Sequence, residues 1–146
     1  MIENLPVFVY GTLRHGHGNY RGILAGNTER EAEATIDGAV MTTNGGFPYV
    51  YFDDEDGGTV YGELMWLRAS NIDDTMRRLD RLEGYRADNP EFSLYLRVKV
   101  TVTVSETGEQ VEAWMYTPSG GKNSRAANLP RVVTGDWNNQ KKVNFV

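Results

Sequence analysis

A glutamate in the second half of the chain is the strongest candidate for proton transfer. Glu83 lies four residues after Leu79, so that it continues an apolar stripe at helical spacing. A carboxylate there faces both partial burial and the negative end of a helix dipole, and both raise its pKa toward neutrality. Such a group can act as a general acid/base. The pattern alone is equally compatible with an exposed glutamate at a frayed helix end.

A second candidate site lies near the N-terminus, where a strand runs into a glycine turn. The segment Val7 to Tyr10 is continuously apolar and is followed by Gly11, Thr12 and Leu13. A strand that ends in glycine can present successive backbone N–H groups as a concave anion site, to which Thr12 adds a hydroxyl. Taken alone, these residues are better explained as an ordinary turn, because strand-to-glycine turns are common.

The chain offers little for metal or cofactor chemistry, and we expect neither. It has no cysteine, which excludes disulfides and thiolate ligands. Its only two histidines, His15 and His17, alternate with glycines, a pattern more typical of a mobile loop than of a metal site. The acidic segment Asp53 to Asp56 lacks the later bidentate glutamate of a calcium loop, so we interpret it as a solvated hairpin turn. The glycines do not have the dinucleotide-binding spacing.

Composition limits the possible classes of protein. With 146 residues, 40% hydrophobic and 24% charged, the chain is expected to form one soluble globular domain over residues 1–146. The net charge of -5 and the absence of a basic cluster argue against a nucleic-acid partner. No signal peptide and no membrane span are predicted, so a cytoplasmic location is expected. The oligomeric state is left open.

One strong helix must position Glu83. The pattern predicts a helix from Ser70 to Leu82, with Ser70 as the N-cap and Asp73 completing a capping box. Gly84 is well placed to end this helix in a left-handed turn. Its apolar stripe consists of Ile72, Met76, Leu79 and Leu82.

Most of the remaining chain alternates as strands do. Val7 to Tyr10 is expected to be a central strand, because its apolar run suits burial on both faces. The long alternation from Leu94 to Val104 places Leu94 on the apolar face. Strands with one helix predict an α+β fold, in which twisted strands curl into a small mixed β-barrel. The other expected elements are a helical turn at 20–24, strands at 32–36, 49–52, 59–67 and 111–116, a flexible polar loop at 118–125 and an aperiodic tail from 128.

Several short motifs occur in one order along the chain. They are Tyr10-Gly11-Thr12-Leu13, Gly46-Phe47-Pro48, Val60 to Leu64, Leu79 to Tyr85, Tyr95-x-Arg97, Ala113 to Tyr116 and Gly135-Asp136-Trp137. Together these motifs resemble the gamma-glutamylcyclotransferase-like family, and the sequence Tyr-Gly-Thr-Leu after the first strand resembles its gamma-glutamylamine cyclotransferase-type branch. The resemblance implies a small mixed barrel with a packed helix.

The resemblance also implies an activity. Family members release 5-oxoproline from small gamma-glutamyl compounds when the substrate's own alpha-amine attacks its gamma-carbonyl. Glu83 aligns with the family's general acid/base, and the reaction needs no enzyme nucleophile, metal or cofactor. The resemblance implies that backbone groups around Gly11, Thr12 and Leu13 hold the substrate's anionic end or the developing oxyanion. Tyr10 and Tyr116 are expected to be pocket walls and hydroxyl donors.

Two classes of function remain open at this stage. The first is an enzyme that cyclises a gamma-glutamyl amine or a gamma-glutamyl peptide. The second is a binding module that keeps the pocket without turnover. The presence of Glu83 favours the first, because binding alone does not require a proton shuttle. The sequence does not specify which gamma-glutamyl compound is used.

Overall fold

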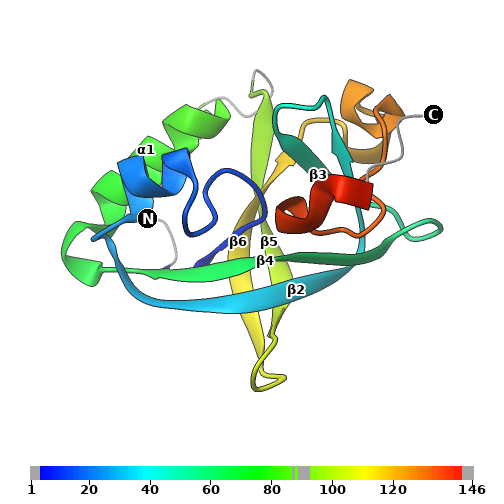
Figure 1. Ribbon diagram of the computed structural model, residues 1–146. Helices are drawn as coiled ribbons and strands as arrows, with labels where there is room; N and C mark the ends of the chain where they lie inside the picture. The colour runs from blue at the N-terminus through cyan, green and yellow to red at the C-terminus, as the bar shows by residue number, and fades with distance from the viewer. Residues whose placement is uncertain (1–3, 87, 89–92, 143–146) are drawn as a thin grey trace.

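The computed structural model describes residues 4–86, 88 and 93–142, and within them five strands close into a barrel (Figure 1). The ring runs β2-β4-β1-β6-β5, and pairing of β5 with β2 closes it. A sixth strand, β3, extends the sheet beside β2. The bounds are β1 Val7–Val9, β2 Thr28–Thr43, β3 Pro48–Phe52, β4 Gly58–Leu67, β5 Tyr95–Val104 and β6 Gln110–Pro118.

In this ring β1 lies between β4 and β6, as the apolar run of its sequence predicts. β1 is antiparallel to β4, with Phe8 opposite Leu64, and parallel to β6, with Val7 opposite Trp114. The parallel pair makes the barrel mixed, so the predicted fold class is confirmed. Val7, Phe8 and Val9 are at most 3% exposed. A strand with neighbours on both edges and side chains buried on both faces fits a continuously apolar segment.

Alternation along β1 divides its side chains between two cores. Phe8 points into the barrel, where it packs with residues such as Leu64 and Val102. Val7 and Val9 point the other way, toward a second cluster that includes Met76 and Leu79 of the helix. The strand therefore joins the barrel interior to the helix layer, and the turn that follows it lies between them.

The helix α1 spans Ile72–Glu83 and ends as predicted but begins differently. Gly84 adopts the left-handed conformation with φ 68° and its N–H donates to the Arg81 carbonyl. The predicted N-cap at Ser70 is wrong, because Ser70 lies inside a 3₁₀ turn, Ala69–Asn71, that leads into the helix. The N-cap position belongs to Asn71, whose side chain makes no capping hydrogen bond.

The structure corrects three further expectations about the strands and the segments next to them. The strand predicted at 32–36 is the middle of β2, which is long because β4 pairs along one edge and β3 and β5 share the other. The acidic turn that includes Asp53 to Asp56 is confirmed as a turn, with the Asp53 carboxylate accepting the Glu55 N–H. It is not a hairpin, because β3 and β4 flank β2 instead of each other. Leu94 precedes β5 and is 75% exposed, not on the apolar face.

Short helical turns complete the chain. The predicted turn at Tyr20–Leu24 is a π-helical turn that packs beside α1 (Figure 1). The loop from 118 and the tail form 3₁₀ turns at Gly121–Asn123, Arg125–Asn128 and Trp137–Lys142. Among the described residues, no helix has both the length and the apolarity needed to cross a membrane.

We expect Gly62→Ala to destabilise the barrel strongly. A Cβ at Gly62 would lie 2.3 Å from the Val9 carbonyl oxygen and 2.7 Å from the Phe8 ring, so β1 and β4 would have to separate. Overpacking of this kind costs on the order of 3 kcal/mol or more of the free energy of unfolding, measured by urea denaturation. Gly22→Ala is the matched control, because no atom lies within 4 Å of a Cβ there. Equal stability of the two variants would contradict the close approach.

Candidate active site

One cavity of about 380 Å³ brings the two candidate segments together. The turn after β1 forms one side, and the C-terminal end of α1 forms the other. The segment before β5, the strand β6 and the turn before β3 complete the wall. Convergence therefore arises through the fold, because these segments are distant in sequence. The residues predicted for the site all line this cavity: Tyr10, Gly11, Thr12, Leu13, Glu83 and Tyr116.

The environment of Glu83 suits proton transfer. Its side chain is half-buried, and burial raises the pKa of the carboxyl from 4.5 to about 7. No donor among the described residues contacts this carboxylate. The sequence predicted a raised pKa from burial and the helix dipole, and burial is the cause that the structure supplies. Near neutral pH the group is present in both protonation states, as a general acid/base requires.

A second carboxylate, Asp80, holds the end of α1 in place. The Arg97 guanidinium on β5 donates to both Asp80 oxygens, at 2.8 and 2.7 Å. The Tyr116 hydroxyl on β6 donates to the same carboxylate. Asp80 therefore fixes the last helical turn, which carries Glu83, against two barrel strands. Sequence reasoning missed this role, although Asp80 and Arg97 both lie in the quoted motifs.

Two tyrosines line the cavity, and both donate their hydroxyl protons to acceptors within the protein. The Tyr10 hydroxyl donates to the Tyr116 carbonyl at 2.8 Å, and the Tyr116 hydroxyl donates to Asp80. Burial raises the pKa of Tyr10 well above its usual value, with a further contribution from Glu83. Burial likewise raises the pKa of Tyr116. The expectation that Tyr10 and Tyr116 are hydroxyl donors to a substrate is therefore corrected, because both hydroxyl protons are donated within the protein while the two residues line the cavity.

The turn after β1 requires glycine at its first position. A Cβ on Gly11 would lie 2.7 Å from Cγ of Pro48, so the proline ring packs directly on the backbone. The Thr12 hydroxyl accepts a hydrogen bond from the Asn19 amide at 2.6 Å. Among the described residues, no protein acceptor meets the N–H groups of Gly11, Thr12 or Leu13. Gly11, Thr12 and Leu13 therefore line the cavity with backbone N–H groups that are unpaired within the described residues.

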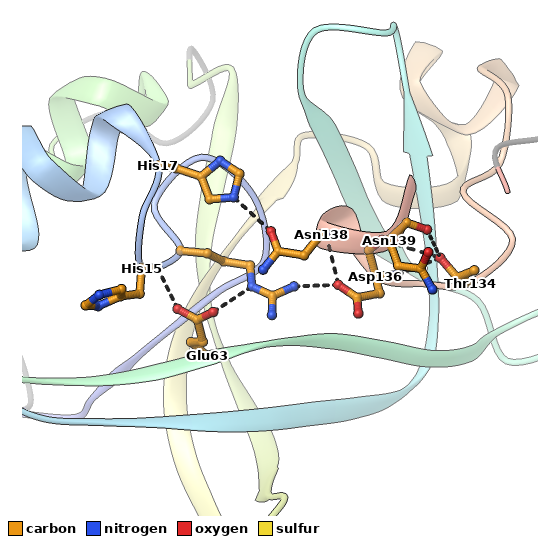
Figure 2. A network of polar contacts seen from close by, with 8 residues as sticks. His15, His17, Glu63, Thr134, Asp136, Asn138 and Asn139 are labelled. Atoms are coloured by element: carbon orange, nitrogen blue, oxygen red, sulfur yellow. Dashed lines mark hydrogen bonds and ion pairs between the residues drawn. The ribbon is translucent and has the colours of Figure 1, made fainter. Parts of the chain in front are cut away.

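A buried ion network fixes this turn from behind. The Arg14 guanidinium contacts Glu63 at 2.9 Å and Asp136 at 2.7 Å, and Arg14 is only 4% exposed. The other Glu63 oxygen accepts the His15 N–H at 2.6 Å. Figure 2 shows Glu63 reaching the network from β4 and Asp136 from the C-terminal segment. The sequence offered only a weak signal for it, a glutamate on an otherwise apolar strand.

The two histidines make separate contacts. The His15 ring pairs with Glu31 at 3.0 Å. The His17 ring meets the Asn138 side chain at 2.8 Å, as Figure 2 shows. Within residues 4–86, 88 and 93–142, no group of three or more histidine or acidic side chains is arranged to hold a metal ion. Both histidines therefore belong to the polar surroundings of the turn.

The structure is thus a closed mixed barrel with a half-buried carboxylate at the wall of an apolar cavity, and concave apolar cavities are the usual form of small-molecule sites. The chain belongs to the family described as "Gamma-glutamyl cyclotransferase, AIG2-like", whose model matches residues 7–139. The resemblance found in the sequence is thus confirmed.

Two relatives with described names support the assignment. Gamma-L-glutamyl-butirosin B gamma-glutamyl cyclotransferase of Niallia circulans is 31% identical over 110 residues, covering 75% of this chain and 64% of that protein. Gamma-glutamylaminecyclotransferase A of Danio rerio is 33% identical over 123 residues, covering 79% of this chain and 70% of that protein. The chain therefore spans just under two thirds of the first of these relatives.

Solved structures share the fold. YkqA from Bacillus subtilis has a TM-score of 0.63 and 27% identity, and the match covers 92% of this chain and 39% of YkqA. An AIG2-like protein from Mus musculus has a TM-score of 0.62 at 24% identity, covering 87% of this chain and 84% of that protein. The second of these likenesses supports the fold alone.

Removing the Arg14 guanidinium should destabilise the protein more than removing an exposed one. Arg14→Met leaves Glu63 buried without its partner, which costs roughly 3–5 kcal/mol of the free energy of unfolding. The double variant Arg14→Met/Glu63→Met should recover part of that loss. Arg77→Met is the control, since its contact with Asp74 is exposed and should contribute little. Equal losses in the two single variants, measured by urea denaturation, would contradict a stabilising network.

Titration of Glu83 should appear in the pH dependence of stability. The folded pKa of about 7 exceeds the ordinary 4.5, so the folded state binds the proton more tightly. Stability from this group is therefore present at low pH and is lost as pH rises through 7. Glu83→Gln removes the titration. Allowing for partial exposure, the variant should gain on the order of 1–2 kcal/mol over the parent between about pH 5 and pH 8.

The control for this titration is a glutamate on the surface. Glu109 is exposed and lies outside the cavity wall, so Glu109→Gln is the matched substitution at both pH values. The measurement is urea denaturation of all three proteins at each pH. A Glu83→Gln curve that runs parallel to the parent curve would show that Glu83 has an ordinary pKa in the folded protein.

Proposed function

We propose that this protein is a gamma-glutamyl cyclotransferase, which converts a gamma-glutamyl amine or a gamma-glutamyl peptide into 5-oxoproline and the free amine. The observation that carries the proposal is the Glu83 carboxylate, with a pKa of about 7, in the cavity bounded by the turn after β1. Membership of the cyclotransferase family supports the same reaction. Relatives with cyclotransferase names support it further.

The proposed reaction needs one proton shuttle. The alpha-amine nitrogen of the substrate attacks the gamma-carbonyl carbon and forms the C–N bond of a five-membered lactam. Glu83 takes the proton that the amine loses. When the bond from the same carbon to the leaving amine breaks, Glu83 returns the proton to that nitrogen. Atoms and charges balance without a covalent enzyme intermediate, and the protein mainly holds a folded substrate in place.

The turn after β1 supplies the proposed electrostatic stabilisation. The N–H groups of Gly11, Thr12 and Leu13 meet no protein acceptor within the described part of the chain, and all three residues line the cavity. Backbone donors held in this way stabilise a carboxylate or a developing oxyanion without reorganisation. The network around Arg14 keeps the donors in place.

The tyrosines are proposed to shape the substrate. Tyr10 and Tyr116 form neighbouring walls, and their hydroxyl protons stay within the protein. Rigid walls favour the folded conformer in which the amine approaches its own carbonyl, and proximity of this kind accounts for much of the rate of intramolecular reactions. The tyrosines therefore act through packing, and Glu83 alone moves the proton.

Replacing Glu83 by glutamine should remove turnover while preserving the fold. Glutamine keeps the size of the side chain but cannot accept the proton, so kcat for 5-oxoproline release should fall by about 10²–10⁴-fold. The parent rate should rise with pH through about 7, as the base loses its proton, and this limb should be absent from the residual activity of the variant. The assay is 5-oxoproline release from gamma-glutamyl amines and dipeptides between about pH 5 and pH 9.

Glu109→Gln is the control for this assay, since its carboxylate is exposed and outside the cavity wall. Thermal unfolding of each variant should accompany the rates. If Glu83→Gln is folded and turns over at the parent rate, Glu83 is not the base. If the parent protein binds gamma-glutamyl compounds without releasing 5-oxoproline, the pocket belongs to a binding module.

A further inference from the structure

Arg97 on β5 contacts the end of α1 on both sides of Glu83. Its guanidinium donates to both oxygens of Asp80, which lies before Glu83 on the helix, at 2.8 and 2.7 Å. The same guanidinium lies over the ring of Tyr85, which follows the helix end, at 4.9 Å from the ring centroid. One side chain of a barrel strand therefore meets the chain both before and after the proposed acid/base.

The Arg97 side chain is itself fixed in place. It is only 7% exposed, and its guanidinium carbon lies 5.1 Å from the ring centroid of Trp114 on β6. Its Nε has no hydrogen-bond partner among the described residues. An arginine that is packed against two rings in a buried position depends strongly on its carboxylate partner, because desolvation of an unpaired charge is costly.

Backbone hydrogen bonds join the same segments. The Tyr85 N–H donates to the Asp80 carbonyl at 2.9 Å, and the Leu94 N–H donates to the Gly84 carbonyl at 3.1 Å. Leu94 lies directly before β5. The helix end and the strand are thus joined by main chain as well as by side chains. The backbone at Glu83 can shift relative to β5 only when these contacts break.

The charge of Asp80 would act on Glu83 if it were not paired. Residues three apart on a helix are neighbours on its surface, and like charges there repel. An unpaired carboxylate beside Glu83 would raise its pKa further, whereas an unpaired guanidinium would lower it. In the observed ion pair the two charges oppose each other, and burial is the cause of the raised pKa of Glu83. Arg81 and Arg86 are exposed, where solvent screens their charges.

The other titratable groups that line the cavity are uncharged near neutral pH. They are Tyr10 after β1, Tyr95 on β5 and Tyr116 on β6. Burial raises the pKa of all three, and Glu83 contributes to the rise for Tyr10 and Tyr95. No lysine, arginine or histidine lines the cavity among the described residues. The buried ion pair behind the wall is therefore the charged feature that acts on Glu83.

We propose that Arg97 is a positioning residue of the proposed active site, which holds the helix end on both sides of Glu83 and neutralises the charge of Asp80 beside it. Arg97 does not line the cavity, so it acts through Glu83 and takes no direct part in the reaction. Its effect is to keep the proton exchange of Glu83 near neutral pH. The inference rests on the proposed cyclotransferase function and concerns the regulation of the same site.

The test is the pH at which Glu83 titrates, followed by the NMR signal of its side-chain carboxyl carbon in isotopically labelled protein. Glu83→Gln identifies the signal by its loss. Arg97→Met leaves Asp80 as an unpaired negative charge, so the midpoint should rise by about 0.5–1 pH unit. Asp80→Asn leaves an unpaired positive charge, so the midpoint should fall by a similar amount. The double variant removes both charges and should return the midpoint to within about 0.3 pH unit of the parent.

The same order should appear in the rate of 5-oxoproline release. The rising limb of the pH–rate profile should move to higher pH in Arg97→Met and to lower pH in Asp80→Asn. Arg97→Lys keeps the positive charge and loses the planar fork, so its limb should stay within about 0.3 pH unit of the parent limb. A residue with a structural role alone would lower the rate without moving the limb in opposite directions.

An exposed ion pair on the same helix supplies the matched controls. Arg77 meets Asp74 at 3.4 Å, and both side chains are largely exposed. Arg77→Met and Asp74→Asn should therefore leave the Glu83 midpoint unchanged, because solvent screens their charges. Urea denaturation shows which variants are folded. Asp80→Asn, which keeps the size of the side chain, and Arg97→Lys test the inference even where Arg97→Met does not fold.

The outcomes separate this inference from the proposed function. Opposite shifts of the midpoint in the two single variants support the inference. Folded variants whose midpoints stay at the parent value, or move in the same direction, would overturn it, while 5-oxoproline release by the parent would leave the proposed function intact. Opposite shifts in a protein that releases no 5-oxoproline from any gamma-glutamyl compound would overturn the proposed function and still support the action of Arg97 on Glu83.

Discussion

The site depends on a buried guanidinium. Arg14 follows directly on the turn that presents the backbone donors, and it is almost fully buried between Glu63 and Asp136. A buried arginine is tolerable only when its donors are paired, so the turn, β4 and the C-terminal segment must come together or leave charges unpaired. The network (Figure 2) thereby holds a turn whose own N–H groups meet no acceptor within the described part of the chain.

Two carboxylates near the end of α1 differ in their hydrogen-bond partners and in their burial. Asp80 is paired with Arg97 and accepts the Tyr116 hydroxyl. Glu83 lies one turn later on the same helix and has no such partner among the described residues, and burial raises its pKa to about 7. One carboxylate anchors the helix to the barrel and the other is left able to gain and lose a proton. Groups so close in sequence differ because their tertiary environments differ.

Close backbone packing around β1 lets so small a barrel carry a cavity. Gly62 on β4 admits the Val9 carbonyl and the Phe8 ring, and Gly11 admits the Pro48 ring. Side chains larger than hydrogen at these positions would push apart the strand and the turn that bound the site. Pro48 also begins β3 directly after Phe47, and both residues line the cavity.

The sequence by itself determined the elements and the main candidates. The apolar run of β1, the alternation of β5 and β6, the stripe of α1 and its stop at Gly84 are local patterns set by strand and helix geometry. The ordered motifs identified the family and placed Glu83 at the end of the helix. Only the tertiary structure decided which carboxylate is paired, what Arg14 contacts, why Ser70 is not a cap and why Leu94 is exposed. The physical reason is that these properties depend on contacts between segments far apart in the chain, and local periodicity carries no information about such contacts.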